Sequence, residues 1–244
     1  LALSDLTRPD YLFLLSPPRA QFANAKAGFG ALRALARHGA VLGGVSGGVF
    51  PLVRSGVMAG HVVSVHWCYD AAFRSEFPEV QASDRVIEVA SRRYTASGAA
   101  AAFDLSLRLI ETRLGADVAT EVACWFQHPL MRGEGVQQSI PTYRSATTDA
   151  TLPPVVAKAV TIFAAHLESP ISVAEVADGV GVSPRQIERS FKKATGQSPS
   201  HYYRALRMKA AKQLVMYSKD SMAQIALQVG YGSTTPMVRH YREA

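Results

Sequence analysis

A tight turn in the first half of the chain carries the residues best placed to do chemistry. Residues 44–48 read Gly-Val-Ser-Gly-Gly, close an apolar run and precede an expected helix. This is the G-x-S-x-G pattern, in which a sharp strand-to-helix turn exposes a serine and directs backbone N–H groups towards one point. The turn therefore offers either a nucleophile at Ser46 or a group of N–H donors that binds an anion.

The nucleophilic alternative needs a base and an orienting acid. His66 and Asp104 are the candidate partners of Ser46, in the order Ser, His, Asp, whereas α/β-hydrolases have the order Ser, Asp, His. A hydroxyl without a positioned base is a poor nucleophile near neutral pH. We keep a serine-dependent hydrolase or amidase as the alternative to a non-catalytic binding function.

The elements that must position this turn alternate between strands and helices. Apolar runs predict buried strands at Tyr11–Leu15, Val41–Val45, Val62–Val65 and Val86–Val89, and helical spacing predicts helices at Asn24–His38 and Ala99–Leu114. The second helix is apolar on more than one face, which predicts contacts with more than one layer. The order indicates an α/β domain with a largely parallel sheet.

The second half of the chain repeats one pattern about 49 residues apart. In each copy a serine with Glu or Gln three residues later predicts a capping box, an alanine admits a crossing helix, and a glycine ends the first helix. These residues are Ser172, Glu175, Ala177 and Gly181 in the first copy and Ser221, Gln224, Ala226 and Gly230 in the second. In the first copy Ser183, Pro184 and Gln186 predict a second helix start, with another capping box. The pattern indicates two helix-turn-helix motifs.

The stretch GQSPSHYYRALRMKAAKQLVMYS between the copies predicts one long helix, capped by Ser198 with Pro199 in its first turn. An apolar stripe at spacing i, i+4 predicts the buried face. The stripe is Tyr202, Leu206, Ala210, Leu214 and Tyr217, and the basic residues Arg204, Arg207, Lys209 and Lys212 lie outside it.

These motifs resemble the AraC-type transcription regulators, whose all-helical DNA-binding domain joins two helix-turn-helix motifs by a long helix. The resemblance covers residues 155–244 and implies that double-stranded DNA is a partner. It leaves RNA polymerase open as a protein partner. It also leads us to expect a homodimer, with Ala99–Leu114 either at the interface or wholly internal.

The distribution of charge gives independent support. Residues 151–244 contain 12 Lys and Arg against 6 Asp and Glu, a net +6, whereas residues 1–150 contain 14 against 13, a net +1. Positive charge confined to one part of the chain favours a polyanion, with affinity that depends on salt.

The family pattern places specific residues on the DNA-reading helices. The exposed residues are expected to be Arg185, Glu188, Arg189 and Lys192 in the first copy and Thr234, Thr235, Val238 and Arg239 in the second, with Lys193 at the phosphates. Ile187, Phe191, Met237 and Tyr241 are expected to point inward. Arg189 and Arg239 occupy equivalent positions, and each suits either guanine O6 and N7 or a phosphate.

The first half resembles the amidotransferase-like sensor domain of the GlxA-like branch of AraC regulators, through GGVSGGVFPLVRSGVMAGHVVSVHW and TASGAAAAFDLSLRLI. Enzymatic relatives carry a reactive cysteine where this chain has Ser46. The resemblance therefore implies that the turn has become part of a pocket for a small-molecule effector.

The expected pocket residues are Ser46, Gly47, Phe50, His66 and Trp67. Sensors in this branch point to a betaine-, carnitine- or amino-acid-like zwitterion, whose cation the ring of Trp67 could receive unless Trp67 is a core residue. Cys68 departs from the branch pattern, which usually has an acidic residue after His-Trp. That departure weakens the case for a cationic effector.

The overall organisation is a sensing domain at residues 1–132, a polar linker at 133–154 and a DNA-binding domain at 155–244. Neither a signal peptide nor a membrane-spanning run is recognisable, and the two cysteines are far apart, so we expect a cytoplasmic protein without a metal or other cofactor. The family would have a further strand-helix-strand portion before residue 1, so we expect the chain to begin inside the sensing domain.

Overall fold

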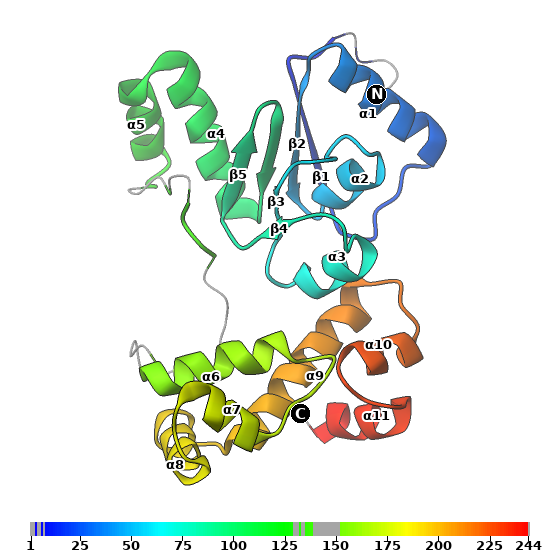
Figure 1. Ribbon diagram of the computed structural model, residues 1–244. Coiled ribbons are helices and arrows are strands. Elements are labelled where there is room, and N and C mark those ends of the chain that lie inside the picture. Colours follow the sequence, from blue (N-terminus) through cyan, green and yellow to red (C-terminus); the bar gives the residue numbers. More distant parts are fainter. Residues whose placement is uncertain are drawn as a thin grey trace. The chain divides into compact units, whose positions relative to one another are not determined.

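The computed structural model describes residues 3, 6, 8–128, 132, 135–138 and 152–243 and divides the chain into two compact units (Figure 1). Unit 1 comprises residues 1–139 and unit 2 residues 140–244. The linker is expected at residues 133–154. At its start, the backbone of residues 136–138 bonds to unit 1, since the Val86 N–H donates to the Val136 carbonyl (2.8 Å) and the Gln138 N–H to the Asp84 carbonyl (2.8 Å).

Unit 1 is built on a four-stranded sheet in the order β1-β2-β6-β5. The strands are β1 (Tyr11–Ser16), β2 (Val41–Ser46), β6 (Arg93–Ala96) and β5 (Ile87–Ala90). β1, β2 and β6 are parallel, and β5 is antiparallel to β6. The largely parallel sheet predicted from the sequence is therefore present, with one antiparallel edge strand.

Helices cover both faces of this sheet (Figure 1). On one face, Leu12, Leu14 and Leu42 pack against α1 (Ala25–Arg37) and α2 (Val49–Arg54). On the other, Phe13 and Val45 pack against α4 (Ala99–Leu114). Neighbouring residues of a strand point to opposite faces, so the apolar runs of β1 and β2 supply two cores.

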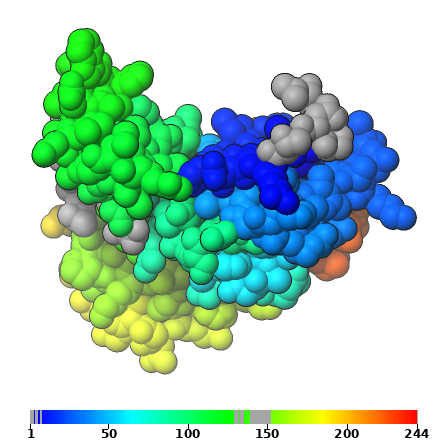
Figure 2. All heavy atoms as spheres, turned by 90° about the horizontal axis from the view of Figure 1, so that it is seen from above, coloured from blue at the N-terminus to red at the C-terminus, as the bar shows by residue number. Residues whose placement is uncertain are grey.

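α4 lies between the sheet and α5 (Ala116–Trp125), which explains why it is apolar on more than one face. Leu105 and Leu107 are buried, whereas Leu114 at its end is 66% exposed, so α4 is not wholly internal. In Figure 2 the green atoms of α4 and α5 project beyond the blue atoms of the same unit. The sequence pattern does not predict α5.

The region around the predicted third strand forms a smaller sheet. β3 (Val63–Ser64) pairs in parallel with β4 (Ala82–Ser83), and α3 (Asp70–Glu76) connects the two. The Ser64 N–H donates to the Thr95 hydroxyl on β6 (2.8 Å), which links the two sheets. β4, β6 and α3 were not predicted, because they are short or lack a clear apolar period.

Unit 2 is all helical in its described residues. The helices are α6 (Pro154–Ala165), α7 (Val173–Val180), α8 (Pro184–Thr195), α9 (Pro199–Tyr217), α10 (Met222–Gln228) and α11 (Thr234–Glu243). The core of the first four is aromatic: the ring of Phe163 stacks on Tyr203 (4.2 Å between centroids), and Phe191 meets Tyr202 edge-on (5.4 Å). α9 connects the helix pair α7–α8 to the pair α10–α11.

The joining helix α9 is buried on more than the predicted stripe. Tyr202, Ala210 and Leu214 are buried as expected, and so are Tyr203 and Met208, which lie off the stripe. The reason is that α9 contacts α6 and α8 as well as α10 and α11, so neighbours cover it on several sides.

Candidate functional sites

The first helix pair of unit 2 starts as predicted. The Ser172 hydroxyl accepts a hydrogen bond from the Glu175 N–H (3.2 Å), and the Glu175 carboxylate accepts one from the Ser172 N–H (2.7 Å). Hydrogen bonds to the Glu175 carboxylate from the Ser172 side chain and from the Ser172 backbone N–H lower the pKa of Glu175. α7 then ends at Gly181, whose φ of 78° lies in the left-handed region that favours glycine.

The start of α8 differs in one detail from the prediction. The Ser183 hydroxyl accepts from the Gln186 N–H (3.3 Å), but the returning bond from the Gln186 side chain does not form among the residues that the structure describes. Pro184 stands in the first turn, where its fixed φ suits a helix and its missing N–H leaves no donor unsatisfied. One of the two hydrogen bonds of a capping box is therefore sufficient at the start of α8.

The second helix pair repeats the arrangement. The Gln224 N–H donates to the Ser221 hydroxyl (3.3 Å), and the Ser221 N–H donates to the Gln224 side chain (2.8 Å). Gly230 follows α10 with a φ of 72°. A Cβ on Gly230 would lie 2.6 Å from the Leu167 carbonyl oxygen and 2.7 Å from Pro170 Cδ. Gly230 therefore both ends the helix and admits the turn that follows α6.

The inward-pointing residues of the two second helices are correct with one exception. Ile187, Phe191 and Met237 have no exposed surface, whereas Tyr241 is 37% exposed. The inward aromatic position is filled instead by Tyr231, whose hydroxyl lies 2.8 Å from His240 Nδ1. The prediction for Tyr241 is therefore wrong.

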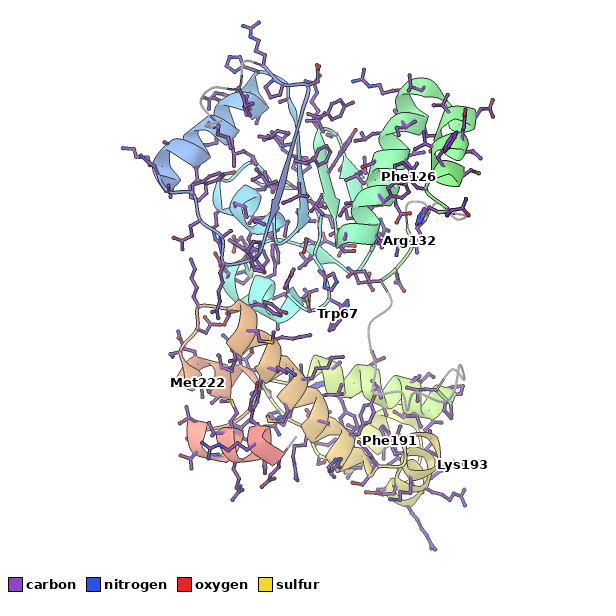
Figure 3. All side chains as sticks on the ribbon, turned by 180° about the vertical axis from the view of Figure 1, so that it is seen from behind. Trp67, Phe126, Arg132, Phe191, Lys193 and Met222 are labelled. Carbon is purple, nitrogen blue, oxygen red and sulfur yellow. The ribbon has the colours of Figure 1, made fainter. Side chains whose placement is uncertain are left out.

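The residues expected to meet DNA reach solvent to different degrees. The exposed ones are Arg185, Glu188, Arg189, Lys192 and Lys193 on α8 and Thr235 and Arg239 on α11, while Thr234 and Val238 are half-buried. Figure 3 shows Lys193 pointing outward and Phe191 lying among the helices. α8 therefore presents four exposed cations beside Glu188, and α11 presents the exposed cations Arg239 and Arg242.

Two of the four basic residues that the sequence placed outside the α9 stripe are half-buried. The Arg207 guanidinium donates to the Val229 and Gly230 carbonyls (both 2.7 Å) and lies over the ring of Tyr231 (4.1 Å). Burial lowers the pKa of Lys209. Arg207 therefore holds the turn that leads into α11. This role is not visible in the sequence, because the two carbonyls that Arg207 contacts lie 22 and 23 residues further along the chain.

In unit 1 the turn between β2 and α2 has the geometry of the G-x-S-x-G pattern. Ser46 has a φ of 56°, a left-handed conformation that is uncommon for any residue except glycine. The Gly48 N–H donates to the Val45 carbonyl (2.9 Å), and the Phe50 N–H to the Gly47 carbonyl (3.1 Å). Two of the N–H groups that an anion would use are thus bonded within the turn.

The catalytic triad considered from the sequence does not assemble. Ser46 Oγ lies 3.4 Å from the Tyr69 hydroxyl. Asp104 is buried in α4, where it contacts His128 Nε2 (3.0 Å) and accepts from Arg132 Nε (2.8 Å). The carboxylate is therefore committed to partners other than His66, and the alternative of a serine hydrolase loses its orienting acid.

Phe50 belongs to the core and has no exposed surface. Its ring packs edge-on against Tyr69 (6.3 Å) and Phe73 (5.4 Å), and the Arg54 guanidinium lies 5.5 Å from its centroid. Phe50 is therefore a core side chain that does not line the cavity described next, and its contact with an effector stays a prediction.

A cavity of about 310 Å³ lies in unit 1 beside His66 and Trp67. It is also lined by residues 98–101 at the start of α4 and by Arg132, but not by Ser46 or Gly47. Figure 3 labels Trp67 and Arg132. Gly98, at the start of α4, provides no side-chain cap, so N–H groups of the first turn remain available to a ligand. The structure brings two of the five expected pocket residues to one cavity.

Gln138 holds this cavity wall, although the sequence placed it in the linker. Its side-chain amide donates to the Val65 carbonyl (2.8 Å), and its side-chain oxygen accepts from the Trp67 N–H (3.0 Å). No local pattern indicates a contact over 71 residues. Asp104 did carry a signal, because a charge within an apolar helix face requires a buried partner.

The comparisons with known proteins agree with the second half of the chain. A family model described as a helix-turn-helix domain matches residues 176–244. The regulators ArgR and GbdR of Pseudomonas aeruginosa, each named an HTH-type transcriptional regulator, are 35% and 36% identical over 87% of this chain. Unit 2 carries an AraC-family helix-turn-helix domain.

The similarity to these regulators extends through both units of the chain. The chain covers 64% of ArgR and 57% of GbdR, and it is 29% identical to the HTH-type transcriptional regulator GlxA of Rhizobium meliloti over 87% of this chain and 64% of that protein. The chain thus spans less than two thirds of the length of each relative. These relatives are consistent with the GlxA-like branch.

Two properties of the described residues bear on partners. No helix in residues 8–128 or 152–243 is both long and apolar enough to cross a membrane. In the same part of the chain, no three His, Cys, Asp or Glu side chains gather to form a metal site.

Proposed function

We propose that this chain is part of a transcription regulator in which both helix pairs of unit 2 are DNA-binding helix-turn-helix motifs. The observation that carries the proposal is the equivalent exposure of Arg189 on α8 and Arg239 on α11, within two helix pairs of the same design. Both follow an inward residue by two positions, Ile187 and Met237 respectively. Each guanidinium can donate two hydrogen bonds to a guanine edge in the major groove.

The length of α9 supports binding to one face of the double helix. Its 19 residues, at a rise of about 1.5 Å per residue, give a rod of about 28 Å. One turn of DNA measures about 34 Å, so two motifs held by such a rod suit successive segments of the major groove. The basic face of α8, with Lys192 and Lys193, adds phosphate contacts.

Substitution of the two arginines tests this function. Arg189→Ala and Arg239→Ala should each weaken binding of the operator by about 1–3 kcal/mol and relax base preference at separate positions one helical turn apart. Lys158→Ala, which removes one exposed positive charge from α6, is the control for net charge. Equal loss of affinity for operator and random DNA in both arginine variants would assign these residues to phosphates instead.

We further propose that unit 1 is an amidotransferase-like, non-catalytic sensing domain that binds a small zwitterion in the cavity beside His66 and Trp67. The cavity, at about 310 Å³, is at the lower end of the usual range for small-molecule sites. The first-turn N–H groups of α4 would receive a carboxylate, and the ring of Trp67 would receive a quaternary or guanidinium cation.

Thermal unfolding with glycine betaine, carnitine and arginine as probes tests the cavity. A ligand that binds the folded state raises the melting temperature, and Trp67→Ala should remove that increase. Ser46→Ala is the matched variant, because Ser46 does not line the cavity. Loss of the increase in Ser46→Ala but not in Trp67→Ala would move the effector to the turn between β2 and α2.

We also propose that the protein acts in the cytoplasm as a homodimer through unit 1, with RNA polymerase as a further partner at promoters. The support for the dimer is the exposed apolar surface of α4 and α5, which includes Leu114 (66% exposed) and Trp125 (79% exposed). Sedimentation equilibrium of the chain and of its Trp125→Ser variant measures the association, and a monomeric chain at high concentration would contradict it.

A further inference from the structure

A thiol and an imidazole lie in contact beside the cavity of unit 1. His66 Nδ1 is 2.9 Å from Cys68 Sγ, and the Cys68 N–H donates to the same nitrogen (3.3 Å). Because an N–H donor is directed at Nδ1, this nitrogen carries its lone pair, and the ring proton resides on Nε2. Nδ1 is therefore oriented to accept the proton of the Cys68 thiol.

The surroundings favour the neutral imidazole. Burial lowers the pKa of His66, which leaves a lone pair on Nδ1 but makes the ring a weaker base than an exposed histidine, so the direct contact with Sγ must carry the proton transfer. Tyr69 and Trp67 pack on the ring, with centroids 5.5 and 5.4 Å away. Among the described residues that line the cavity the charged one is Arg132, which forms an ion pair with the buried Asp104 (2.7 Å).

Cys68 is only partly exposed and forms no disulfide. We propose that Cys68 is a reactive thiol, with His66 as its base, and that small carbon electrophiles modify it covalently. The thiol proton passes to His66 Nδ1, the sulfur lone pair forms an S–C bond, and the leaving group departs with the electron pair of the bond that breaks. This site is separate from DNA binding and needs no bound effector.

Cys124 gives an internal reference, since it is an exposed thiol on α5 of the same unit. The thiolate is the reactive form, and a less basic thiolate is intrinsically slower, so a tenfold gain in thiolate fraction gives roughly a threefold gain in rate. We therefore expect iodoacetamide at pH 6.5 to alkylate Cys68 at least about three times faster than Cys124, as measured by mass spectrometry of the two peptides.

The pH dependence of the same reaction separates an activated thiol from an accessible one. Below its pKa, the rate of an unperturbed thiol rises about tenfold per pH unit. Between pH 6 and 8 the Cys68 rate should rise less steeply than the Cys124 rate. A Cys68 rate equal to or below that of Cys124 at pH 6.5 overturns the proposal.

His66→Asn tests the role of the base, because its amide oxygen can accept the thiol hydrogen bond but cannot take the proton. We expect the Cys68 rate to fall below the Cys124 rate in this variant, with the Cys124 rate unchanged. An unchanged Cys68 rate in folded His66→Asn overturns the role of His66. If the variant does not fold, the two pH profiles of the unmodified chain decide the question.

Discussion

Alanine substitutions at the two helix-ending glycines of unit 2 should have unequal effects, although the backbone is nearly the same. Gly181 and Gly230 have φ values of 78° and 72°. A left-handed alanine costs about 1–2 kcal/mol. Alanine also leaves the unfolded chain with less conformational entropy than glycine, which offsets about 0.4–1 kcal/mol of that cost. Gly181→Ala should therefore destabilise its helix end by about 0.5–1 kcal/mol, since a Cβ there meets nothing within 4 Å.

Gly230→Ala adds a steric overlap that Gly181→Ala lacks. Its Cβ would lie 2.6 Å from the Leu167 carbonyl oxygen and 2.7 Å from Pro170 Cδ, both in a turn whose backbone must move. Overpacking of this kind costs about 1–3 kcal/mol, which brings the total to about 1.5–4 kcal/mol. A factor of ten in an equilibrium corresponds to about 1.4 kcal/mol, so local opening should increase about 10- to 700-fold, against about 2- to 5-fold in Gly181→Ala.

Amide hydrogen exchange of the full chain measures both effects, because it resolves local opening in α10 separately from α7. Gly230→Ala should reduce protection over Met222–Gln228, and Gly181→Ala should reduce it only slightly over Val173–Val180. Equal losses in the two variants would refute the steric argument and leave backbone conformation as the whole cause.

Three other perturbations follow from the same contacts. Arg207→Met should lower the free energy of local opening in α11 by about 1–3 kcal/mol and so speed hydrogen exchange there, because two charge-assisted bonds to the Val229 and Gly230 carbonyls are lost. Arg204→Met, which changes an exposed site on α9, should leave exchange in α11 unchanged. Lys193→Ala should weaken binding equally for operator and random DNA in a filter-binding titration and reduce the slope of log K against log salt by about 1, and a base-dependent loss would contradict this. Because the pKa of His66 is lowered in the folded chain, the unfolded chain binds a proton at His66 more readily. The contribution of neutral His66 to the free energy of unfolding is therefore full above about pH 6.5 and is lost as the pH falls through the folded-state pKa. The melting temperature of unit 1 should therefore drop on acidification, and a drop of the same size in His66→Asn would exclude His66 as a source.

The elements that depend on local signals could be predicted from the sequence. The capping serines Ser172 and Ser221, the helix-ending Gly181 and the apolar run of β2 each reflect contacts within a few residues. The turn at Ser46 was recognisable for the same reason, because its glycines and its left-handed backbone belong to one short segment.

The features that were missed depend on contacts between distant segments. Gln138 contacts Trp67 across 71 residues, and Arg132 contacts Asp104 across 28. The burial of Phe50 depends on the packing of α3, whose Phe73 meets the Phe50 ring, and that helix has no clear period in the sequence. For the candidate cavity, the sequence therefore identified His66 and Trp67 but not the residues that hold them.

Both tryptophans of the chain lie in unit 1, Trp67 at the cavity wall and Trp125 on the exposed end of α5. With excitation beyond the absorption of tyrosine, the intrinsic fluorescence of the chain therefore comes from unit 1 alone, and unit 2 is optically silent. Exposed Trp125 should emit as a tryptophan in water, so a quencher in solution can suppress it and leave Trp67 as the remaining source. A fluorescent label on DNA can then report on unit 2 while Trp67 reports on the cavity, and one titration can follow the two units independently.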